Sequence, residues 1–169
     1  MKIVSTPRLI LREFTLADAP EFFHLNADPE VMRYTGDKPF TSFQDAEDLI
    51  RGYHYYCTDG FGRWTVVRSD DGAVLGWCGL RKQASGDVDL GYRLHRRFWG
   101  QGYATEAALV SVRIGFEQYK LLQIIGRVAR ANVGSIRVLE KCGLRYWKET
   151  GSECNIADAM IYVTQAVRK

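Results

Sequence analysis

The chain has 169 residues, of which 46% are hydrophobic and 25% charged, and its formal net charge is +3 at pH 7. This composition is typical of a folded globular domain, and the small, dispersed positive charge argues against a nucleic-acid partner. No apolar run reaches the ~20 residues that cross a bilayer, so we expect no membrane partner. The first residues lack the apolar core of a secretion signal, so we expect a cytoplasmic protein.

Cysteine and histidine are too scattered to form a metal site. The four cysteines, Cys57, Cys78, Cys142 and Cys154, contain no CxxC pair, and the three histidines are far apart in the sequence. In a cytosolic chain this pattern favours free, mostly buried thiols over disulfides or zinc. We therefore predict no bound metal.

Strand and helix signals alternate along the first third of the chain. TPRLILREF, residues 6–14, alternates apolar and polar residues as a strand does. Thr15 with Asp18 three residues later is a plausible helix start, and Thr41 or Ser42 is another. The predicted elements are a strand at 6–14, a helix at 17–27, a helical turn at 28–34 and a second helix from 42 to about 57.

The remaining chain adds strands and a long apolar helix. Two β-rich runs joined by Asp70-Asp71-Gly72 predict a hairpin, and Gly143 follows a short helix at the position after its C-cap. No repeat or linker divides the sequence, so we predict one mixed α/β domain over residues 1–169. The predicted elements are strands at 63–68, 74–81, 87–94, 123–128, 144–149 and 157–167, and helices at 102–119 and 132–142.

The stretch Gly100-Gln101-Gly102 lies between a predicted strand and the long helix. The first turn of a helix has unpaired N–H groups and the positive end of the helix dipole. Glycines there let the backbone approach an anion such as a pyrophosphate, and Arg96 or Arg97 could add charge. An ordinary turn is the simpler alternative. A dinucleotide fingerprint is excluded because Thr105 stands where its third glycine would be, and no Lys-Ser/Thr pair marks a P-loop.

Other motifs accompany this loop in a fixed order. Residues 97–102 fit R/Q-x-x-G-x-G/A, and residues 131–144, ANVGSIRVLEKCGL, resemble A-N-x-x-S-x-x-v-l-E-K-x-G-F. These are the two signatures of the GNAT acetyltransferases. Residues 6–12, 90–94 and 158–162 look like the ribosomal-protein N-acetyltransferase branch, the RimJ/RimL type. The chain thus resembles that family from about Thr6 to about Val167.

The resemblance implies a GNAT fold of the α/β (α+β) type. This fold has a central mixed, mostly antiparallel sheet of about seven strands, flanked by helices, with a splayed pair of parallel strands. The pair would be residues 87–94 and 123–128, with the pantetheine arm of acetyl-CoA between them. The implied cofactor-binding residues are Tyr92 and Leu94 through their backbone, Arg97, Gly100, Gln101, Gly102, Tyr103, Ala104, Thr105, Asn132 and Ser135. Asn132 is also a good helix N-cap.

The implied reaction is direct attack of an amine on the thioester in a ternary complex. Asp89 aligns with an acidic position of the family and could take the amine proton, directly or through water, although it could equally face solvent. Many GNAT enzymes have a tyrosine at the position of Leu139 that is thought to protonate the leaving thiolate. Ser135 could hydrogen-bond the sulfur instead, or a thiolate of pKa ~8.5 could leave unaided. We expect Cys142 to pack rather than to act as a nucleophile.

The acceptor stays open at this stage. The resemblance implies a protein N-terminus or a small amine, and the layout of the family makes Glu13, Asp158 and Tyr162 candidates to bind it. One alternative is an aminoglycoside-type antibiotic acetyltransferase, for which an acidic cleft would suit a polycation. Another is a non-catalytic acyl-CoA sensor, because the tyrosine is missing at Leu139. The chain could be a monomer or a homodimer.

Overall fold

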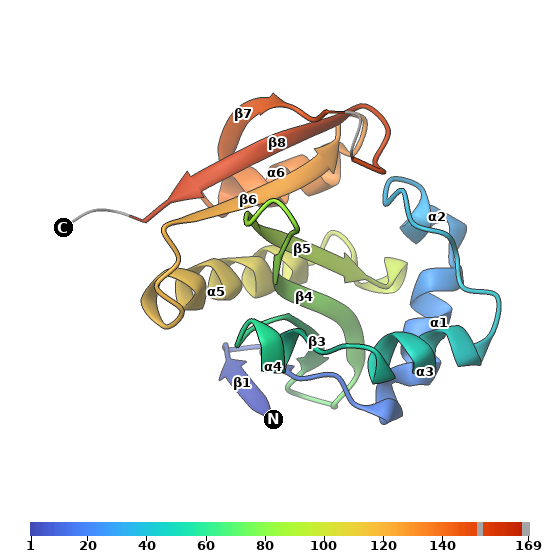
Figure 1. Cartoon of the computed structure of the whole chain (residues 1–169). Helices are drawn as coiled ribbons and strands as arrows, with labels where there is room; N and C mark the ends of the chain where they lie inside the picture. Colours follow the sequence, from blue (N-terminus) through green and yellow to red (C-terminus); the bar gives the residue numbers. More distant parts are fainter. Residues whose placement is uncertain (152–153, 167–169) are drawn as a thin grey trace.

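The computed structural model describes residues 1–151 and 154–166. Figure 1 shows helices on both sides of a strongly twisted sheet. The strands are β1 (Lys2–Ser5), β2 (Leu9–Arg12), β3 (Arg63–Arg68), β4 (Val74–Lys82), β5 (Val88–Leu94), β6 (Gln123–Ala129), β7 (Arg145–Glu149) and β8 (Ala159–Gln165). The helices are α1 (Ala19–Ala27), α2 (Pro29–Met32), α3 (Phe43–Arg51), α4 (Tyr55–Thr58), α5 (Tyr103–Glu117) and α6 (Val133–Lys141), with 3-10 turns η1 (Leu16–Asp18) and η2 (Arg96–Phe98).

The strands form one sheet in the order β1-β2-β3-β4-β5-β6-β8-β7. Neighbouring strands are antiparallel except β5 and β6, which pair in parallel at one position, Asp89 with Ile125. Both strands continue several residues past this position without further pairing, so their C-terminal ends splay apart. The splayed parallel pair and the mostly antiparallel sheet confirm the predicted fold class.

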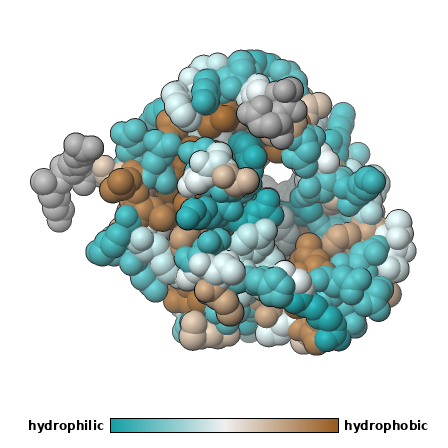
Figure 2. Space-filling model, viewed as in Figure 1, coloured by the Kyte–Doolittle hydropathy of each residue, from teal (hydrophilic) through white to brown (hydrophobic). Residues whose placement is uncertain are grey.

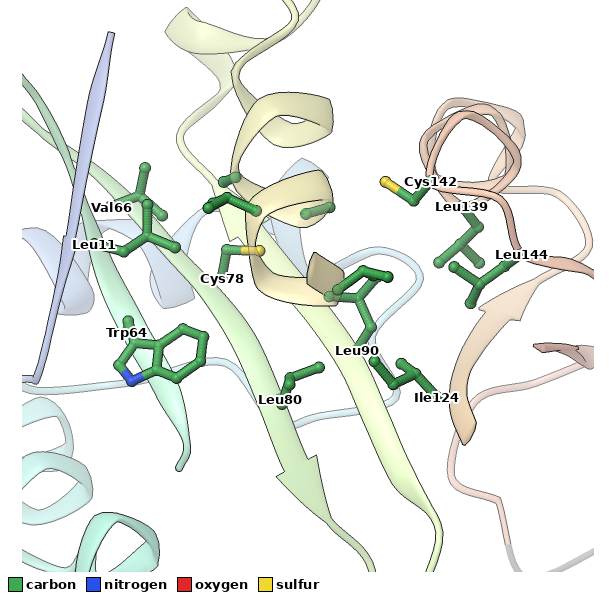
Figure 3. Packing of buried hydrophobic residues seen from close by; sticks show 14 of the residues in the cluster. Leu11, Trp64, Val66, Cys78, Leu80, Leu90, Ile124, Leu139, Cys142 and Leu144 are labelled. Carbon is green, nitrogen blue, oxygen red and sulfur yellow. The ribbon is translucent and has the colours of Figure 1, made fainter. Parts of the chain in front are cut away.

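Helix α5 packs against one face of the central strands (Figure 3). Gly115 allows a close approach, because a Cβ there would lie 2.8 Å from Ile124 and 2.9 Å from Leu80. On the same face, Leu139 of α6 packs over Gly126 of β6 and is 1% exposed. The two helices are therefore fixed to the sheet on either side of the point where it splays.

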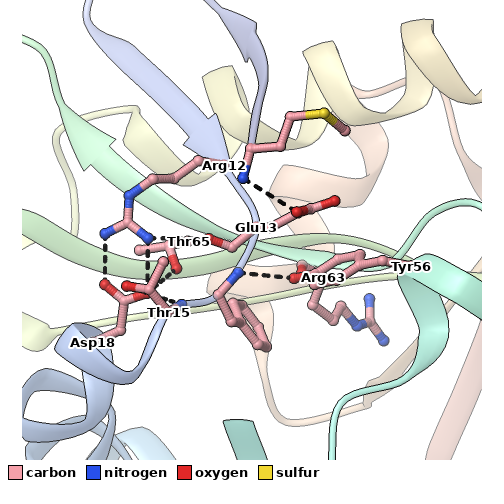
Figure 4. Close-up of polar contacts among 9 residues, drawn as sticks. Arg12, Glu13, Thr15, Asp18, Tyr56, Arg63 and Thr65 are labelled. Atoms are coloured by element: carbon pink, nitrogen blue, oxygen red, sulfur yellow. Dashed lines mark hydrogen bonds and ion pairs between the residues drawn. The ribbon is translucent and has the colours of Figure 1, made fainter. Parts of the chain in front are cut away.

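The opposite face of the sheet is covered near its start by α1 and α3, whose Phe22 and Ala46 pack in a second apolar cluster. A buried carboxylate ties this layer to the strands, as Figure 4 shows. Asp18 accepts hydrogen bonds from both terminal nitrogens of Arg12, at 2.8 and 2.6 Å, and from Thr65 Oγ1 at 2.8 Å. The predicted helix start at Thr15 is confirmed, since Thr15 N donates to the same carboxylate.

Three details differ from the sequence-based prediction. The helix that begins after Ser42 ends at Arg51 rather than near residue 57, because Gly52 is its C-cap and α4 is a separate turn. The sheet has eight strands rather than about seven, since the chain before Thr6 forms β1 against β2. The last strand ends at Gln165, and the end of the stretch predicted for it, at Val167, lies outside the described residues.

Candidate active site

The site lies where β5 and β6 separate. Figure 2 shows an opening through the molecule in this region, between the ends of the two strands and the segment after α2. The chain leaves β5 through η2 to start α5, and it leaves β6 through a short turn to start α6. The N-terminal ends of both helices are thus connected to the splayed strands by short segments, with the positive end of each helix dipole nearby.

The glycine loop before α5 has the backbone that an anion cradle requires. Gly100 and Gly102 have φ angles of 73° and 81°, in the left-handed region that glycine adopts without strain. Gly102 is the N-cap of α5. The N–H groups of Gly100, Gln101, Gly102, Tyr103, Ala104 and Thr105 donate no hydrogen bond to another described residue. These donors are grouped at the positive end of a fifteen-residue helix.

A residue pair that the sequence analysis missed braces this loop. Arg8, from the turn before β2, donates to Glu106 Oε2 at 2.6 Å and to the carbonyl of Gln101 at 3.0 Å. Thr6 Oγ1 also donates to Glu106, at 2.5 Å. Burial favours protonated Glu106, but the Thr6 and Arg8 hydrogen bonds outweigh it and lower its pKa. No local signal could find the pair, because its members are 98 residues apart.

The arginines before the loop are turned to other partners. Arg97 pairs with Glu21 at 3.4 Å and lies over the ring of Phe98, while Arg96 lies 3.9 Å from Asp28. Their side chains are 62% and 57% exposed, so either guanidinium has room to turn. The backbone of the loop therefore offers the more direct anion contacts.

The start of α6 brings three predicted residues together across the gap. Asn132 is the helix N-cap, and its Oδ1 accepts a hydrogen bond from Ser135 N at 3.1 Å. The Tyr92 hydroxyl donates to the carbonyl of Ser135 at 2.8 Å and lies 2.8 Å from Ser135 Oγ. Burial raises the pKa of Tyr92, so its phenol stays protonated at neutral pH. A contact by the Tyr92 side chain was not foreseen, since the sequence suggested only its backbone.

The carbonyl of Leu94, by contrast, already has a partner. Trp99 Nε1 donates to it at 2.7 Å, which gives Trp99 a structural role and leaves the Leu94 N–H as the group a ligand could use. Leu139 is buried in the core against Gly126 and does not face the gap. Cys142 is also buried, and burial raises the pKa of its thiol to about 12.

Asp89, the residue predicted as a base, does not face solvent as Asp87 partly does. It is 6% exposed, at the last paired position before the strands splay. Its Oδ2 accepts a hydrogen bond from Arg63 at 2.6 Å, and its Oδ1 lies 3.7 Å from Arg127 Nε. Arg63 fits there because Gly91 has no side chain, and a Cβ at Gly91 would collide with the guanidinium. Asp89 is therefore an ion-paired carboxylate at the edge of the gap.

The residues suggested for the acceptor are not gathered in one place. Glu13 pairs with the N-terminal amino group at 3.1 Å, and Asp158 pairs with Arg130 at 3.4 Å. Tyr162 is buried in the core. No group of three or more possible metal ligands occurs among residues 1–151 and 154–166, and no helix in these ranges is long and apolar enough to span a membrane.

Comparison with known proteins shows the family of the chain. The chain matches the acetyltransferase (GNAT) domain over residues 8–145. It is 33% identical over 152 residues to the uncharacterized N-acetyltransferase p20 of Bacillus licheniformis, an alignment that covers 88% of this chain and 84% of that protein.

Solved structures share the fold at low sequence identity. The spermidine N-acetyltransferase of Vibrio cholerae, in complex with CoA and spermine, has a TM-score of 0.80 at 19% identity, covering 95% of this chain and 96% of that chain. RimL, a ribosomal L7/L12 α-N-protein acetyltransferase in complex with CoA, has a TM-score of 0.79 at 14% identity, covering 98% of each chain.

The family match and the shared fold thus define an acyl-group transferase. The chain belongs to the GNAT acetyltransferase family, and it is an N-acetyltransferase.

Proposed function

We propose that this protein transfers the acetyl group of acetyl-CoA directly to a primary amine, with both substrates bound at the gap between β5 and β6. The observation that carries the proposal is the set of free N–H donors from Gly100 to Thr105, located where the splayed pair opens. A pyrophosphate at these donors would leave the rest of the CoA molecule free to enter the gap. Proteins of the same fold solved with CoA support acetyl-CoA as the source of the acetyl group.

Three groups of residues fit the chemistry of acetyl-CoA and would hold it. Backbone N–H groups of residues 100–105 suit the pyrophosphate, and Arg97 has room to add a charge-assisted contact. The backbone of Tyr92 and the N–H of Leu94, on the part of β5 that does not pair with β6, suit the amides of the pantetheine arm. The side-chain amide of Asn132 still has its donor group for the same arm, because its hydrogen bond to Ser135 uses only Oδ1.

Ser135 is the group that we place beside the leaving sulfur. Tyr92 holds it by two contacts of 2.8 Å, so its hydroxyl has a fixed position in the gap. In the transfer a C–N bond forms and the C–S bond breaks, and negative charge develops on sulfur. A hydrogen bond from a neutral hydroxyl stabilises this charge more than it stabilises the thioester. The pair thus offers what a tyrosine at Leu139 would supply, which weakens the alternative of a non-catalytic sensor.

Asp89 is the group that we propose to receive the amine proton, through a water molecule. Its Oδ1 makes no hydrogen bond to another described residue, whereas Arg63 holds Oδ2. An α-amine with a pKa of ~7.7–8.0 is partly deprotonated at neutral pH, so it needs less help from a base than a lysine-like amine does. The nitrogen loses its proton to Asp89 or to water, and the sulfur finally leaves as the thiol.

One experiment tests the proposal as a whole. Release of free CoA thiol from acetyl-CoA is measured with N-terminal peptides, small amino acids, polyamines and aminoglycosides as acceptors, and CoA binding is measured separately by calorimetry. We expect CoA to bind and thiol release to depend on an added amine. If CoA bound but no amine gave turnover, the sensor alternative would replace the enzyme, and if CoA did not bind, the cradle assignment would be wrong.

A further inference from the structure

Three guanidinium groups gather beside the gap, on the face of the sheet opposite α5. Arg63 of β3 pairs across the strands with Gly79 and then Gly91, and its side chain lies over these two glycines to reach Asp89. Arg93 lies on the same face of β5, two residues beyond Gly91. Arg127 comes from β6, on the other side of the gap.

In the described part of the chain, two carboxylates form ion pairs with these three cations. Asp89 is held by Arg63 at 2.6 Å, and Asp37 is held by Arg93 at 2.7 Å. Arg127 lies 3.7 Å from the already paired Asp89, and it makes no hydrogen bond to another described residue. Its side chain is 25% exposed, compared with 9% for Arg63. The cluster therefore has one positive charge in excess, and Arg127 is its most accessible member.

The other carboxylates near the end of β6 do not compensate this charge. Glu149 and Asp158 both pair with Arg130, at 2.7 and 3.4 Å. Burial lowers the pKa of Arg93, and Arg63 lowers it further, while Asp37 opposes both effects. A polycation would thus meet paired carboxylates and a positive field, whereas an anion would find a guanidinium with free donors.

We propose that the acceptor amine carries a carboxylate, as an amino acid or a peptide with an acidic group near its N-terminus does, and that Arg127 binds this carboxylate. The inference rests on the proposed function, since it names the acceptor of the same gap. A guanidinium binds a carboxylate through two parallel hydrogen bonds, which would also orient the amine. The neighbouring cations would disfavour the ammonium form, so the amine is more readily available as the free base.

The test compares acceptors that differ only in this charge. Glycine, 3-aminopropanoate and 4-aminobutanoate are each measured against their own carboxamide, with spermidine as the polycation. Values of kcat/KM are expressed per concentration of free base, because an amino acid and its amide differ in amine pKa. We expect at least one carboxylate to exceed its amide by about tenfold or more, the size of one charge-assisted hydrogen bond.

Variants then assign the preference to a residue. Arg127→Gln should remove most of the preference and raise the acceptor KM, while Arg127→Lys should keep part of it. Arg81→Gln is the matched control, because Arg81 lies on the same face of the sheet, directly across from Asp89 on β4, but its guanidinium lies over the Tyr55 ring. It should leave the preference unchanged.

The outcomes separate the two proposals. Equal rates for carboxylates and amides, or a preference for spermidine, would overturn the inference while the acetyltransferase function stands. A preference that survives Arg127→Gln would also overturn it, because another group would then bind the carboxylate. Absence of thiol release with every amine would overturn the proposed function and this inference with it.

Discussion

The Tyr92 hydroxyl lies 2.8 Å from both the Oγ and the carbonyl oxygen of Ser135, which joins β5 to the first turn of α6 across the gap. Burial raises the pKa of this phenol, so it acts as a hydrogen-bond donor throughout the neutral range. The phenol has a single proton, which it donates to the Ser135 carbonyl. The Ser135 hydroxyl can therefore donate its own proton either to the Tyr92 oxygen or to an incoming sulfur. The two side chains therefore work as one unit.

The first prediction concerns this unit. Tyr92→Phe keeps the ring packing and removes only the hydroxyl. We expect kcat to fall about tenfold, which corresponds to the ~1.5 kcal/mol of a weak hydrogen bond to a charged group, with the KM for acetyl-CoA nearly unchanged. Ser135→Ala should cost a similar factor. The double variant should be no slower than the worse single variant, because the two residues share one contribution.

A second readout does not depend on turnover. The thiol of bound CoA is titrated by its thiolate absorbance, and we expect Tyr92→Phe to raise its pKa, because a donor to the charged form is weakened. Tyr146→Phe is the control, since Tyr146 is 52% exposed on β7 and donates to Glu149. An unchanged thiol pKa in Tyr92→Phe, together with an unchanged kcat, would show that the pair is only structural.

The glycine loop gives the second prediction. Gly102→Val forces a β-branched residue to φ near 81° at the N-cap of α5, which costs roughly 1–2 kcal/mol of strain or a shift of the loop. We expect the Kd for CoA to rise about tenfold by calorimetry. Gly72→Val is the matched control, because Gly72 has φ 73° and open space around it in the hairpin after β3. It should lower stability and leave the CoA affinity unchanged; equal affinities in both variants would contradict the cradle.

Asp89 has two proposed roles, which the third prediction separates. Asp89→Asn keeps the shape but leaves Arg63 buried without its partner, so we expect a loss of about 3 kcal/mol in the free energy of unfolding by urea denaturation. If Asp89 also takes the amine proton, the loss in kcat/KM should be larger at pH 7 than at pH 9, where more amine is already free. An equal loss at both pH values would leave Asp89 with the ion pair alone.

The local parts of the site could be predicted from the sequence, whereas the long-range pairs could not. Gly100, Gly102 and Asn132 are recognisable because turns and helix caps depend on neighbouring residues. The partners Arg63 and Asp89 are 26 residues apart, and Tyr92 and Ser135 are 43 residues apart. Only the register of β3, β4 and β5 brings the first pair together, and only the splay of β5 from β6 allows the second.

The fold was predictable to a similar extent. Alternating polarity and capping residues place most strands and helices within a few residues. The failures have physical causes: Gly52 ends α3 early, and β1 is stable only because β2 offers it an edge. Leu139 is the informative case for function. Its position in the family indicated a missing acid, and the structure shows that its side chain packs in the core. Nothing in the neighbouring sequence indicated that Tyr92 reaches the same helix.

The fourth prediction uses the carboxylate that ties α1 to the sheet. Burial alone would raise the pKa of Asp18, but hydrogen bonds from Arg12, Thr15 and Thr65 outweigh it and hold the pKa below its ordinary value. A carboxylate with a lowered folded pKa contributes stability above its unfolded pKa of ~3.9, and this stability is lost as the pH falls through the folded value.

Asp18→Asn should therefore destabilise the protein strongly at pH 6 and less at pH 3. Urea unfolding of both proteins at each pH gives the difference directly. We expect this difference to be smaller at pH 3 than at pH 6, because the stability that the ionised carboxylate contributes begins to be lost below its unfolded pKa. A difference that stayed constant with pH would mean that Asp18 acts through packing rather than through its charge.

Cys142 gives the last prediction, because it decides between direct attack and an acetyl-enzyme intermediate. Its thiol is 6% exposed, lies 4.0 Å from the carbonyl of Thr105, and has a pKa raised to about 12 by burial, with a smaller contribution from Cys78. A thiol in that state is a poor nucleophile at neutral pH. We expect acetyl-CoA alone to leave the protein mass unchanged, and iodoacetamide to label the exposed Cys57 before Cys142. Cys142→Ala should keep kcat within about threefold while lowering stability by ~1 kcal/mol for the lost packing. An acetylated protein in the mass spectrum that disappears in this variant would establish the covalent route instead.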